Sequence, residues 1–277
     1  MPQTKTAQTK TAQTKTTAAS PLAAPRRMAA PIRALILGGT SEARALAARI
    51  ANDACVHATV SLAGRTSAPL AQSLPTRIGG FGGVEGLKRY LEEERVDRVI
   101  DATHPFAARI SANAREACAA LGLPLLVLTR APWSRMEGDR WIEAADNAGA
   151  VVALGEAPRR VFLTIGRLGL ADFLGAPQHY YLIRTIERPS ENDLPPRNRL
   201  ILERGPFTVE SELSLMREAG IDVIVSKNSG GRDTYAKIEA ARTLGLEVVM
   251  ITPPGGGGAR VVHDVETAAA FLFSEEP

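Results

Sequence analysis

From Ile32 onward, short apolar runs alternate with segments whose apolar residues recur every three to four positions. Short apolar runs bounded by turn residues are typical of buried strands, and the longer spacing is typical of amphipathic helices. In the first half the pattern predicts strands at 33–37, 56–62, 76–78, 98–101 and 124–129, with helices at 42–50, 84–94 and 106–121. Strands that alternate with helices favour a parallel sheet covered by helices.

A polar stretch, RAPWSRMEGDRW at 130–141, interrupts this rhythm and is interpreted as a connection between domains. The alternation then resumes, with strands expected at 160–164, 180–184, 199–203, 221–225 and 247–251 and helices at 208–218, 234–244 and 265–273. The fold class predicted is therefore α/β, with two Rossmann-like, doubly wound parallel-sheet domains and a cleft between them. The expected boundaries are residues 32–134 for the first domain and 135–277 for the second.

The N-terminal residues 1–31 differ from the rest in composition. They contain a five-residue repeat, QTKTA, and five basic residues without any acid, so residues 32–277 carry −2 of the whole chain's +3. The basic pI near 9.0 thus comes from this segment, which removes the main argument for a nucleic-acid partner. We expect a disordered low-complexity extension without a catalytic role, and Met28 is a candidate start.

The remaining composition and motifs bear on membrane insertion, metal binding and the type of catalysis. No apolar run reaches the roughly 18 residues that a membrane span needs. The two cysteines, Cys55 and Cys118, lack metal-type spacing and fit a reducing compartment. No serine nucleophile elbow, HExxH, CxxC pair or Walker lysine occurs, and no metal is expected. A cytoplasmic, monomeric protein is expected.

Unusual residues collect where the predicted strands end. These ends read GGTS (38–41), SLAGR (61–65), GGFGG (79–83), DATHPF (101–106), TIGR (164–167), ERGPF (203–207) and SKNSGG (226–231). Ligands of open α/β sheets bind beyond the carboxyl ends of the strands. The pattern predicts that both domains present these edges to a shared ligand site.

The first strand end favours a nucleotide, although the G-x-G-x-x-G fingerprint is missing. Gly38 and Gly39 would let a ligand approach the backbone, and Thr40 would cap the following helix, whose N-terminus favours anions. Glu42 would repel a phosphate there unless it turns away. A plain βα turn remains the alternative.

The second strand end bears on which dinucleotide would bind. NAD sites place an acid here for the ribose, whereas NADP sites place an arginine for the 2′-phosphate. This strand ends without an acid and offers Ser61, Gly64, Arg65 and Thr66. If a dinucleotide binds, NADP is expected; otherwise Arg65 is a solvated surface charge.

Two further strand ends carry candidate polar groups. His104 lies beside Pro105, which disfavours helix at His104 and holds the imidazole at a loop tip, where it either meets a ligand or has a structural role. Asp101 would orient His104 or cap the turn. Lys227, Asn228 and Ser229 of the SKNSGG segment suit anion recognition, or they belong to a plain glycine-rich loop.

Together these motifs resemble one family, the precorrin-6A reductases (CobK/CbiJ) of cobalamin biosynthesis. The matching pieces are ILGGTSEARALA, SLAGRT, GGFGG, DATHPFAARIS, PWSRMEGDRW, TIGR, GPF, VSKNSGG and AKIEAARTLGLEVVM. They run in the family's order from Leu35 to Met250. One departure is Thr252-Pro253-Pro254, where the family pattern has Arg-Pro.

The resemblance implies an oxidoreductase that uses NADPH to reduce one carbon–carbon double bond of the tetrapyrrole precorrin-6A, giving precorrin-6B. We expect the cofactor on Gly38, Gly39, Thr40, Ser61, Gly64, Arg65, Thr66, Gly82, Thr103 and His104. We expect the polycarboxylate substrate on Arg167, Lys227, Asn228, Ser229 and Arg232, with Arg184, Arg188 and Arg204 as further arginines of this half. His104 and Lys227 are the catalytic candidates. A reductase of another acidic substrate and a non-catalytic tetrapyrrole-binding or sensor protein remain the alternatives.

Overall fold

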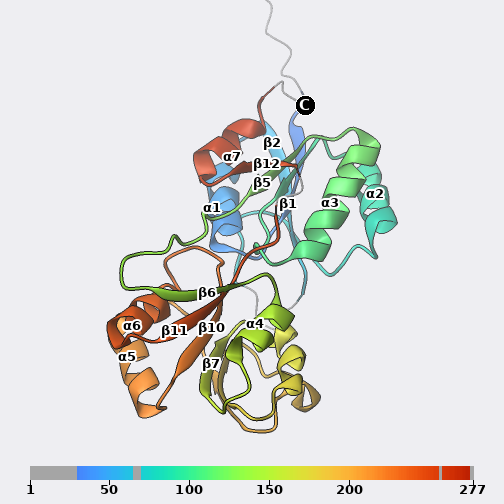
Figure 1. Ribbon diagram of the computed structural model, residues 1–277. Helices are drawn as coiled ribbons and strands as arrows, with labels where there is room; N and C mark the ends of the chain where they lie inside the picture. The colour runs from blue at the N-terminus through green and yellow to red at the C-terminus, as the bar shows by residue number, and fades with distance from the viewer. Residues whose placement is uncertain (1–29, 65–69, 256–257, 275–277) are drawn as a thin grey trace, which may run out of the picture. The chain divides into compact units, whose positions relative to one another are not determined.

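Parallel strand pairing organises the chain into two six-stranded sheets in the computed structural model (Figure 1). The structure describes residues 30–64, 70–255 and 258–274. The first sheet has the order β12-β5-β4-β1-β2-β3 and the second the order β6-β11-β10-β7-β8-β9. These two sheets with interleaved helices confirm the predicted fold class, and the expected cleft and domain boundaries stay predictions.

The first sheet is built from β1 (Ile32–Leu37), β2 (Val56–Leu62), β3 (Thr76–Ile78), β4 (Arg98–Asp101), β5 (Leu125–Leu128) and β12 (Arg260–Val262). Its central strands are apolar and buried on both faces, as expected for a parallel sheet between helices. The side chains of α1 (Ser41–Ile50) and α7 (Val265–Phe271) pack on one face. Those of α2 (Val84–Glu93) and α3 (Ala108–Leu121) pack on the other.

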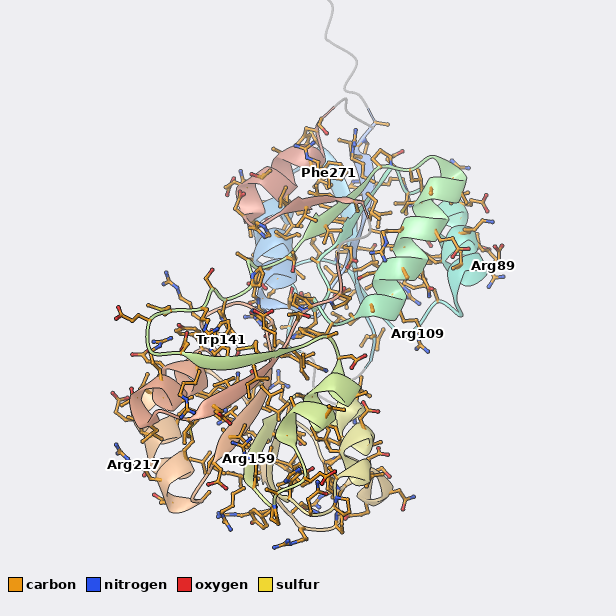
Figure 2. The ribbon with its side chains drawn as sticks, viewed as in Figure 1. Arg89, Arg109, Trp141, Arg159, Arg217 and Phe271 are labelled. Atoms are coloured by element: carbon orange, nitrogen blue, oxygen red, sulfur yellow. The ribbon has the colours of Figure 1, made fainter. Side chains whose placement is uncertain are left out.

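The second sheet comprises β6 (Arg140–Ala144), β7 (Arg160–Thr164), β8 (Tyr180–Thr185), β9 (Asn198–Leu202), β10 (Val223–Lys227) and β11 (Glu247–Ile251). Helix α4 (Asn147–Leu154) and the short 3₁₀ turn Ala171–Gly175 cover one face. Helices α5 (Val209–Glu218) and α6 (Ala236–Leu244) cover the other, where Trp141 joins the core (Figure 2). The outer strands β8 and β9 continue the parallel register, with Ile183 opposite Leu200.

The strand order reverses once in each sheet, and these switch points are where α/β proteins bind ligands. In the first sheet the reversal lies between β1 and β4, and the Thr40 hydroxyl donates to the Ala102 carbonyl at 2.8 Å across it. In the second sheet it lies between β7 and β10, where the Thr164 hydroxyl donates to the Val225 carbonyl at 3.0 Å. Hydrogen bonds therefore join the two strand ends at both switch points.

The sheet membership of the C-terminal segment differs from the sequence-based assignment. Residues 260–272 were placed in the second domain, but β12 pairs with β5 and α7 packs on α1 of the first sheet. Phe271 and Leu272 are buried in that core (Figure 2). Strand β6, by contrast, joins the second sheet as expected for residues 135–277, and it pairs with β11 at the edge rather than with β7, the next strand in the sequence.

Two strands and one α-helix of the described residues were not predicted from the sequence, besides short 3₁₀ turns. Strand β6 starts inside the segment interpreted as a connection, and its exposed Arg140 and Glu143 make it look like loop. Helix α4 is apolar throughout and lacks a polar face, and β12 has only three residues. All of the elements that were predicted are present, and their ends agree with the structure or differ by one or two residues.

Residues 31–277 form one compact unit that holds both sheets. The expected N-terminal extension lies outside the described residues, apart from Ala30 and Pro31. Among the described helices, none is both long enough and apolar enough to cross a membrane.

Candidate active site at the carboxyl edges of the sheets

The turn between β1 and α1 leaves backbone donors available. Thr40 caps α1 by accepting a hydrogen bond from the Ala43 N–H at 3.1 Å, as its position predicts. The N–H groups of Gly39, Ser41 and Glu42 donate to no acceptor among the described residues. Gly39 has a φ of 120°, and a Cβ added there would enter open space. A ligand can therefore approach this backbone closely, and the helix N-terminus favours an anionic one.

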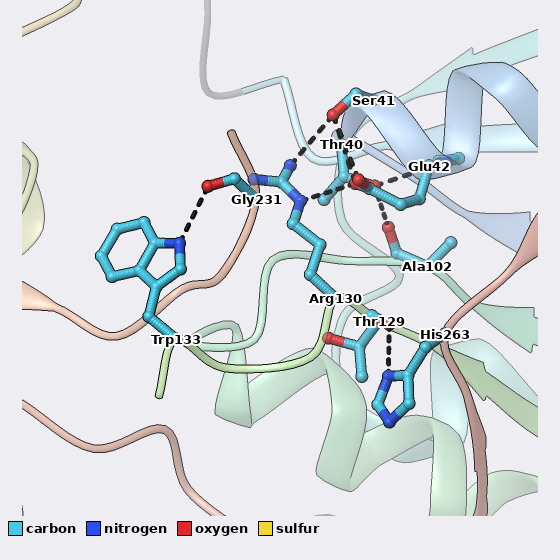
Figure 3. Close-up of polar contacts among 10 residues, drawn as sticks. Thr40, Ser41, Glu42, Ala102, Thr129, Arg130, Trp133, Gly231 and His263 are labelled. Carbon is cyan, nitrogen blue, oxygen red and sulfur yellow. Dashed lines mark hydrogen bonds and ion pairs between the residues drawn. The ribbon is translucent and has the colours of Figure 1, made fainter. Parts of the chain in front are cut away.

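Arg130 resolves the difficulty that Glu42 raised in the sequence (Figure 3). Its Nε donates to Glu42 Oε2 at 2.8 Å and its Nη2 donates to Ser41 Oγ at 3.1 Å. The acid at the start of α1 is thus paired with a cation, so it opposes a phosphate less than an unpaired carboxylate would. Sequence reasoning missed Arg130 because its partners lie 88 and 89 residues away along the chain.

The next edge, between β2 and β3, is organised by Arg77, also missed from the sequence. Its guanidinium donates to Ser61 Oγ at 2.8 Å and to the carbonyls of Gly79 and Gly80 at 2.9 and 3.1 Å. It also stacks over the Phe81 ring, 3.9 Å from the centroid. Ser61, expected to bind the cofactor, is buried and accepts this hydrogen bond from Arg77, and its cofactor contact stays a prediction.

The other predicted residues of this edge differ in what surrounds them. A Cβ on Gly64 would lie 3.1 Å from Ile78 Cγ2, so that glycine permits close packing. Gly82 has a φ of 82° and faces open space. Arg65 and Thr66 lie outside the described residues, and their cofactor role stays a prediction.

The DATHPF segment places His104 beside two cations. Asp101 is buried and caps the turn, because Thr103 donates to its Oδ1 at 3.1 Å through N–H and at 2.7 Å through the hydroxyl. Asp101 was expected either to orient His104 or to cap the turn, and these hydrogen bonds show that it caps the turn. The Phe106 N–H donates to His104 Nδ1 at 3.2 Å, which puts the proton of the neutral ring on Nε2.

The pKa of His104 is lowered to about 4. Desolvation is the largest cause, although part of the residue remains exposed to solvent, and the charges of Lys227 and Arg130 add to it. The ring is therefore neutral near pH 7. It can donate a hydrogen bond from Nε2 to a ligand, but it is not a reservoir of an acidic proton at that pH.

Lys227 ends β10 at the switch point of the second sheet. Its ammonium lies 5.2 Å from the centroid of the Phe106 ring, so the edges of the two sheets meet here. Desolvation lowers the pKa of Lys227, and the charge of Asp172 opposes this shift. A lysine with a lowered pKa releases its proton more readily than an exposed one, which suits a general acid.

Asn228 and Trp133 clamp the connection onto the loop after β10. The Trp133 N–H donates to Asn228 Oδ1 at 2.7 Å, and Asn228 Nδ2 donates to the Trp133 carbonyl at 3.0 Å. The Trp133 indole donates to the Gly231 carbonyl at 2.8 Å (Figure 3). Asn228 and Ser229 are both buried, and the Asn228 amide already has these partners; substrate contact by either remains a prediction.

The arginines of the second half are not equally available to a substrate. Arg184 is buried against Glu212 and between the rings of Phe162 and Phe207, so our expectation that it is available to carboxylates was wrong. Arg167, which follows β7, pairs with Glu187 at 3.3 Å rather than with Asp172.

Arg188 and Arg232 lie in more open surroundings. Arg188 is exposed and pairs with Glu191 at 3.3 Å. Arg232 lines a cavity of about 680 Å³ together with Trp133, Phe207 and Tyr235. At the end of β11, Thr252 donates to the Ala144 carbonyl through its N–H at 2.9 Å and its hydroxyl at 3.3 Å, which closes the pairing with β6.

The first-sheet switch point has features that suit a phosphate-bearing ligand. Available N–H groups at the start of α1, open space at Gly39 and a cation held beside Glu42 are what a phosphate-bearing ligand needs. Among the described residues there is no cluster of three side chains suited to a metal ion. Fold and site together define a doubly wound α/β protein with ligand-binding switch points.

Comparison with known proteins identifies the family. A family model described as precorrin-6x reductase CbiJ/CobK matches residues 33–272. The precorrin-6A reductase of Rhodobacter capsulatus is 54% identical over 241 residues, which cover 87% of this chain and 95% of that protein. That of Rhodococcus erythropolis is 48% identical over 241 residues, covering 87% and 97%. The chain belongs to the precorrin-6x reductase CbiJ/CobK family, and it is an oxidoreductase of cobalamin biosynthesis.

A solved structure agrees with this assignment. CobK precorrin-6A reductase matches with a TM-score of 0.81 and 50% identity, covering 87% of this chain and 96% of that chain. The expected family and fold class are therefore confirmed.

Proposed function

We propose that this protein reduces one carbon–carbon double bond of precorrin-6A with NADPH, giving precorrin-6B. Family membership carries the proposal, and the open turn between β1 and α1 supports its cofactor part. Bound NADPH would supply a hydride to one carbon of the double bond. The protein has to bind both molecules, orient them and supply a proton to the other carbon.

On the cofactor side, the N–H groups of Gly39, Ser41 and Glu42 would bind phosphate oxygens, while Arg130 compensates the Glu42 carboxylate. Arg65 would bind the 2′-phosphate, since an acid is absent at this strand end. His104 Nε2 would donate a hydrogen bond to the ligand as a neutral ring.

On the substrate side, Arg167 and Arg232 are the arginines best placed for carboxylates. Arg232 is exposed and lines the cavity beside Trp133, and Arg167 sits at the second switch point. Bidentate arginine–carboxylate pairs would position the polycarboxylate macrocycle. Binding by Arg167 requires exchange of its Glu187 partner for a substrate carboxylate.

For the proton donor, the structure favours Lys227 over His104. His104 is neutral near pH 7, whereas Lys227 lies at the same edge with a lowered pKa. Lys227→Met should reduce kcat strongly, by about 10²-fold or more for a lost general acid. NADPH affinity should stay within about twofold, and a proportional loss of both would contradict the assignment.

Similarity also favours the cobalt-free substrate. Relatives named precorrin-6A reductase are 47–54% identical, whereas the cobalt-precorrin-6A reductase of Priestia megaterium is 30% identical over 232 residues. That alignment covers 79% of this chain and 90% of the relative. We therefore expect precorrin-6A to be preferred over its cobalt complex.

The test is an anaerobic assay that follows NADPH absorbance with precorrin-6A and, separately, with the cobalt form. We expect equimolar NADPH oxidation and a product heavier by two hydrogens, and a lower kcat/KM for NADH and for the cobalt form. Tight tetrapyrrole binding without NADPH oxidation would instead indicate a binding protein. Oxidation with other acidic acceptors alone would indicate a different reductase.

A further inference from the structure

Arg130 connects the end of β5 with the start of α1 through partly buried polar contacts. Its side chain is 17% exposed and that of Glu42 is 23% exposed, and they form an ion pair at 2.8 Å. Among the described residues, Nη1 of Arg130 donates to no acceptor. One guanidinium group thus pairs with the acid of the α1 turn and keeps one donor available.

The opposite side of Arg130 is covered by the loop after β10. A Cβ on Gly231 would lie 2.6 Å from Arg130 Nη1 and 2.7 Å from its Cδ, and one on Gly230 would clash with the Ala131 carbonyl. Both glycines have positive φ angles, 64° at Gly230 and 82° at Gly231. The loop backbone therefore packs directly against Arg130 and Ala131, with no room for a side chain between them.

The same loop is fixed to the residues that follow Arg130. The Trp133 N–H donates to the Asn228 side chain, and the Trp133 carbonyl accepts from it. The Trp133 indole donates to the Gly231 carbonyl. Lys227 directly precedes Asn228, so its backbone lies next to this clamp. A shift of the Arg130 side chain would therefore change the packing of the loop that directly follows Lys227.

We propose that Arg130 is a positioning residue that couples anion binding at the α1 turn to the placement of loop 228–231, which directly follows Lys227. An anion at the N–H groups of this turn repels Glu42, and Arg130 compensates both charges. Because the Gly231 backbone approaches Arg130 so closely that a Cβ would not fit between them, a rearranged Arg130 side chain would displace this loop. This inference rests on the proposed NADPH function, and it links the cofactor side of the site to the Lys227 side.

The first test measures NADP⁺ affinity by titration calorimetry for wild type, Arg130→Gln, Glu42→Gln and the double variant. Arg130→Gln should weaken binding about fivefold or more, because Glu42 becomes an uncompensated negative charge. Glu42→Gln in the Arg130→Gln background should restore most of this loss. Equal affinities for Arg130→Gln and the double variant would overturn the compensating role. Arg89→Gln, an exposed arginine of α2, is the matched control (Figure 2).

The second test follows hydrogen exchange of backbone amides at saturating NADP⁺. In wild type we expect protection of residues 38–43 and also of 226–234. In Arg130→Gln the first region should stay protected while the second loses its protection, with the melting temperature measured in parallel. Unchanged protection of 226–234 in the variant would overturn the coupling alone. Absence of NADP⁺ binding by the wild-type protein would overturn the proposed cofactor, and the coupling with it.

Discussion

At the scale of single residues, desolvation and neighbouring charges together determine the protonation of His104. Desolvation lowers its pKa most, the charges of Lys227 and Arg130 lower it further, and Glu42 opposes them. The folded pKa of about 4 lies below the ordinary value of 6.5. Between these pH values the unfolded chain binds more protons, so the stability contribution of neutral His104 is complete above pH 6.5 and declines towards pH 4.

Lys227→Met should therefore raise the pKa of His104, because it removes the cation whose charge lowers that pKa more than the charge of Arg130 does. An NMR titration of the imidazole signals measures the change directly. Lys88→Met, on α2 and paired with Glu85, should leave the His104 titration unchanged. An unchanged His104 pKa in Lys227→Met would show that the charge of Lys227 does not contribute to the shift.

Arg65 gives the residue-scale prediction on cofactor choice. Because it stands where NAD enzymes carry an acid, Arg65→Ala should weaken NADPH binding by about 1.5–3 kcal/mol, the value of a charged hydrogen bond, and NADH binding far less. Fluorescence titrations with both cofactors measure the difference. Equal losses for both would contradict a 2′-phosphate contact, and Arg89→Ala serves as control.

Single residues also mark the limit of sequence reasoning about the site. Glycines, capping residues and the lysine at strand ends could be found because a strand end is a local pattern in the sequence. Arg130 and Arg77 could not, because their roles come from contacts across the fold: Arg130 with Glu42 and Gly231, and Arg77 with Ser61. The pairing of Arg184 with Glu212 is equally invisible in the sequence.

At the scale of elements, α5, α6 and β8 meet around a buried charged group. Glu212 of α5 is 1% exposed and accepts from Arg184 Nη2 at 3.1 Å. Lys237 of α6 is also buried, and desolvation followed by the charge of Arg184 lowers its pKa to about 7, with Glu212 opposing the shift. Glu212 therefore compensates Arg184, which also lies 3.9 Å from Glu203, and it opposes the lowering of the Lys237 pKa.

Glu212→Gln should lower the free energy of unfolding by about 3 kcal/mol, since removing one partner of a buried pair leaves the other charge uncompensated. Chemical denaturation at constant pH measures this change. Glu210→Gln, an exposed neighbour on the same helix, should change stability by less than about 0.5 kcal/mol. Similar stabilities of the two variants would mean that solvent reaches the pair.

The elements themselves were predicted well where their pattern was strong. Strands such as β2 and β7 are apolar runs between turn residues, and their predicted limits agree with the structure. Strand β6 was missed because three of its five residues are exposed, and α4 because its apolar sequence has no helical period. Periodicity shows which residues are buried, but it does not show which sheet an edge strand joins.

At the scale of the whole molecule, the chain leaves the first sheet after β5 and returns to it only with β12 and α7. His263 Nδ1 lies 2.8 Å from the Thr129 carbonyl, which links the returning segment to the residue before Arg130 (Figure 3). Phe271 is 5% exposed in the same core as Leu46 and Ile50 of α1. The C-terminal segment is thus part of the sheet that carries the proposed cofactor site.

Phe271→Ala tests this dependence against the opposite end of the chain. The substitution should cost about 3–5 kcal/mol, because a buried aromatic ring is lost and the Arg98 guanidinium 5.1 Å from its centroid loses its contact. NADP⁺ affinity should fall as well, since α7 supports α1.

A chain starting at Met28 should keep the melting temperature and NADP⁺ affinity of the full chain, because residues 1–31 lack a core-forming pattern. Calorimetry on the three proteins decides: a destabilised Met28 chain, or a Phe271→Ala variant with unchanged stability, would contradict this account of which end supports the fold.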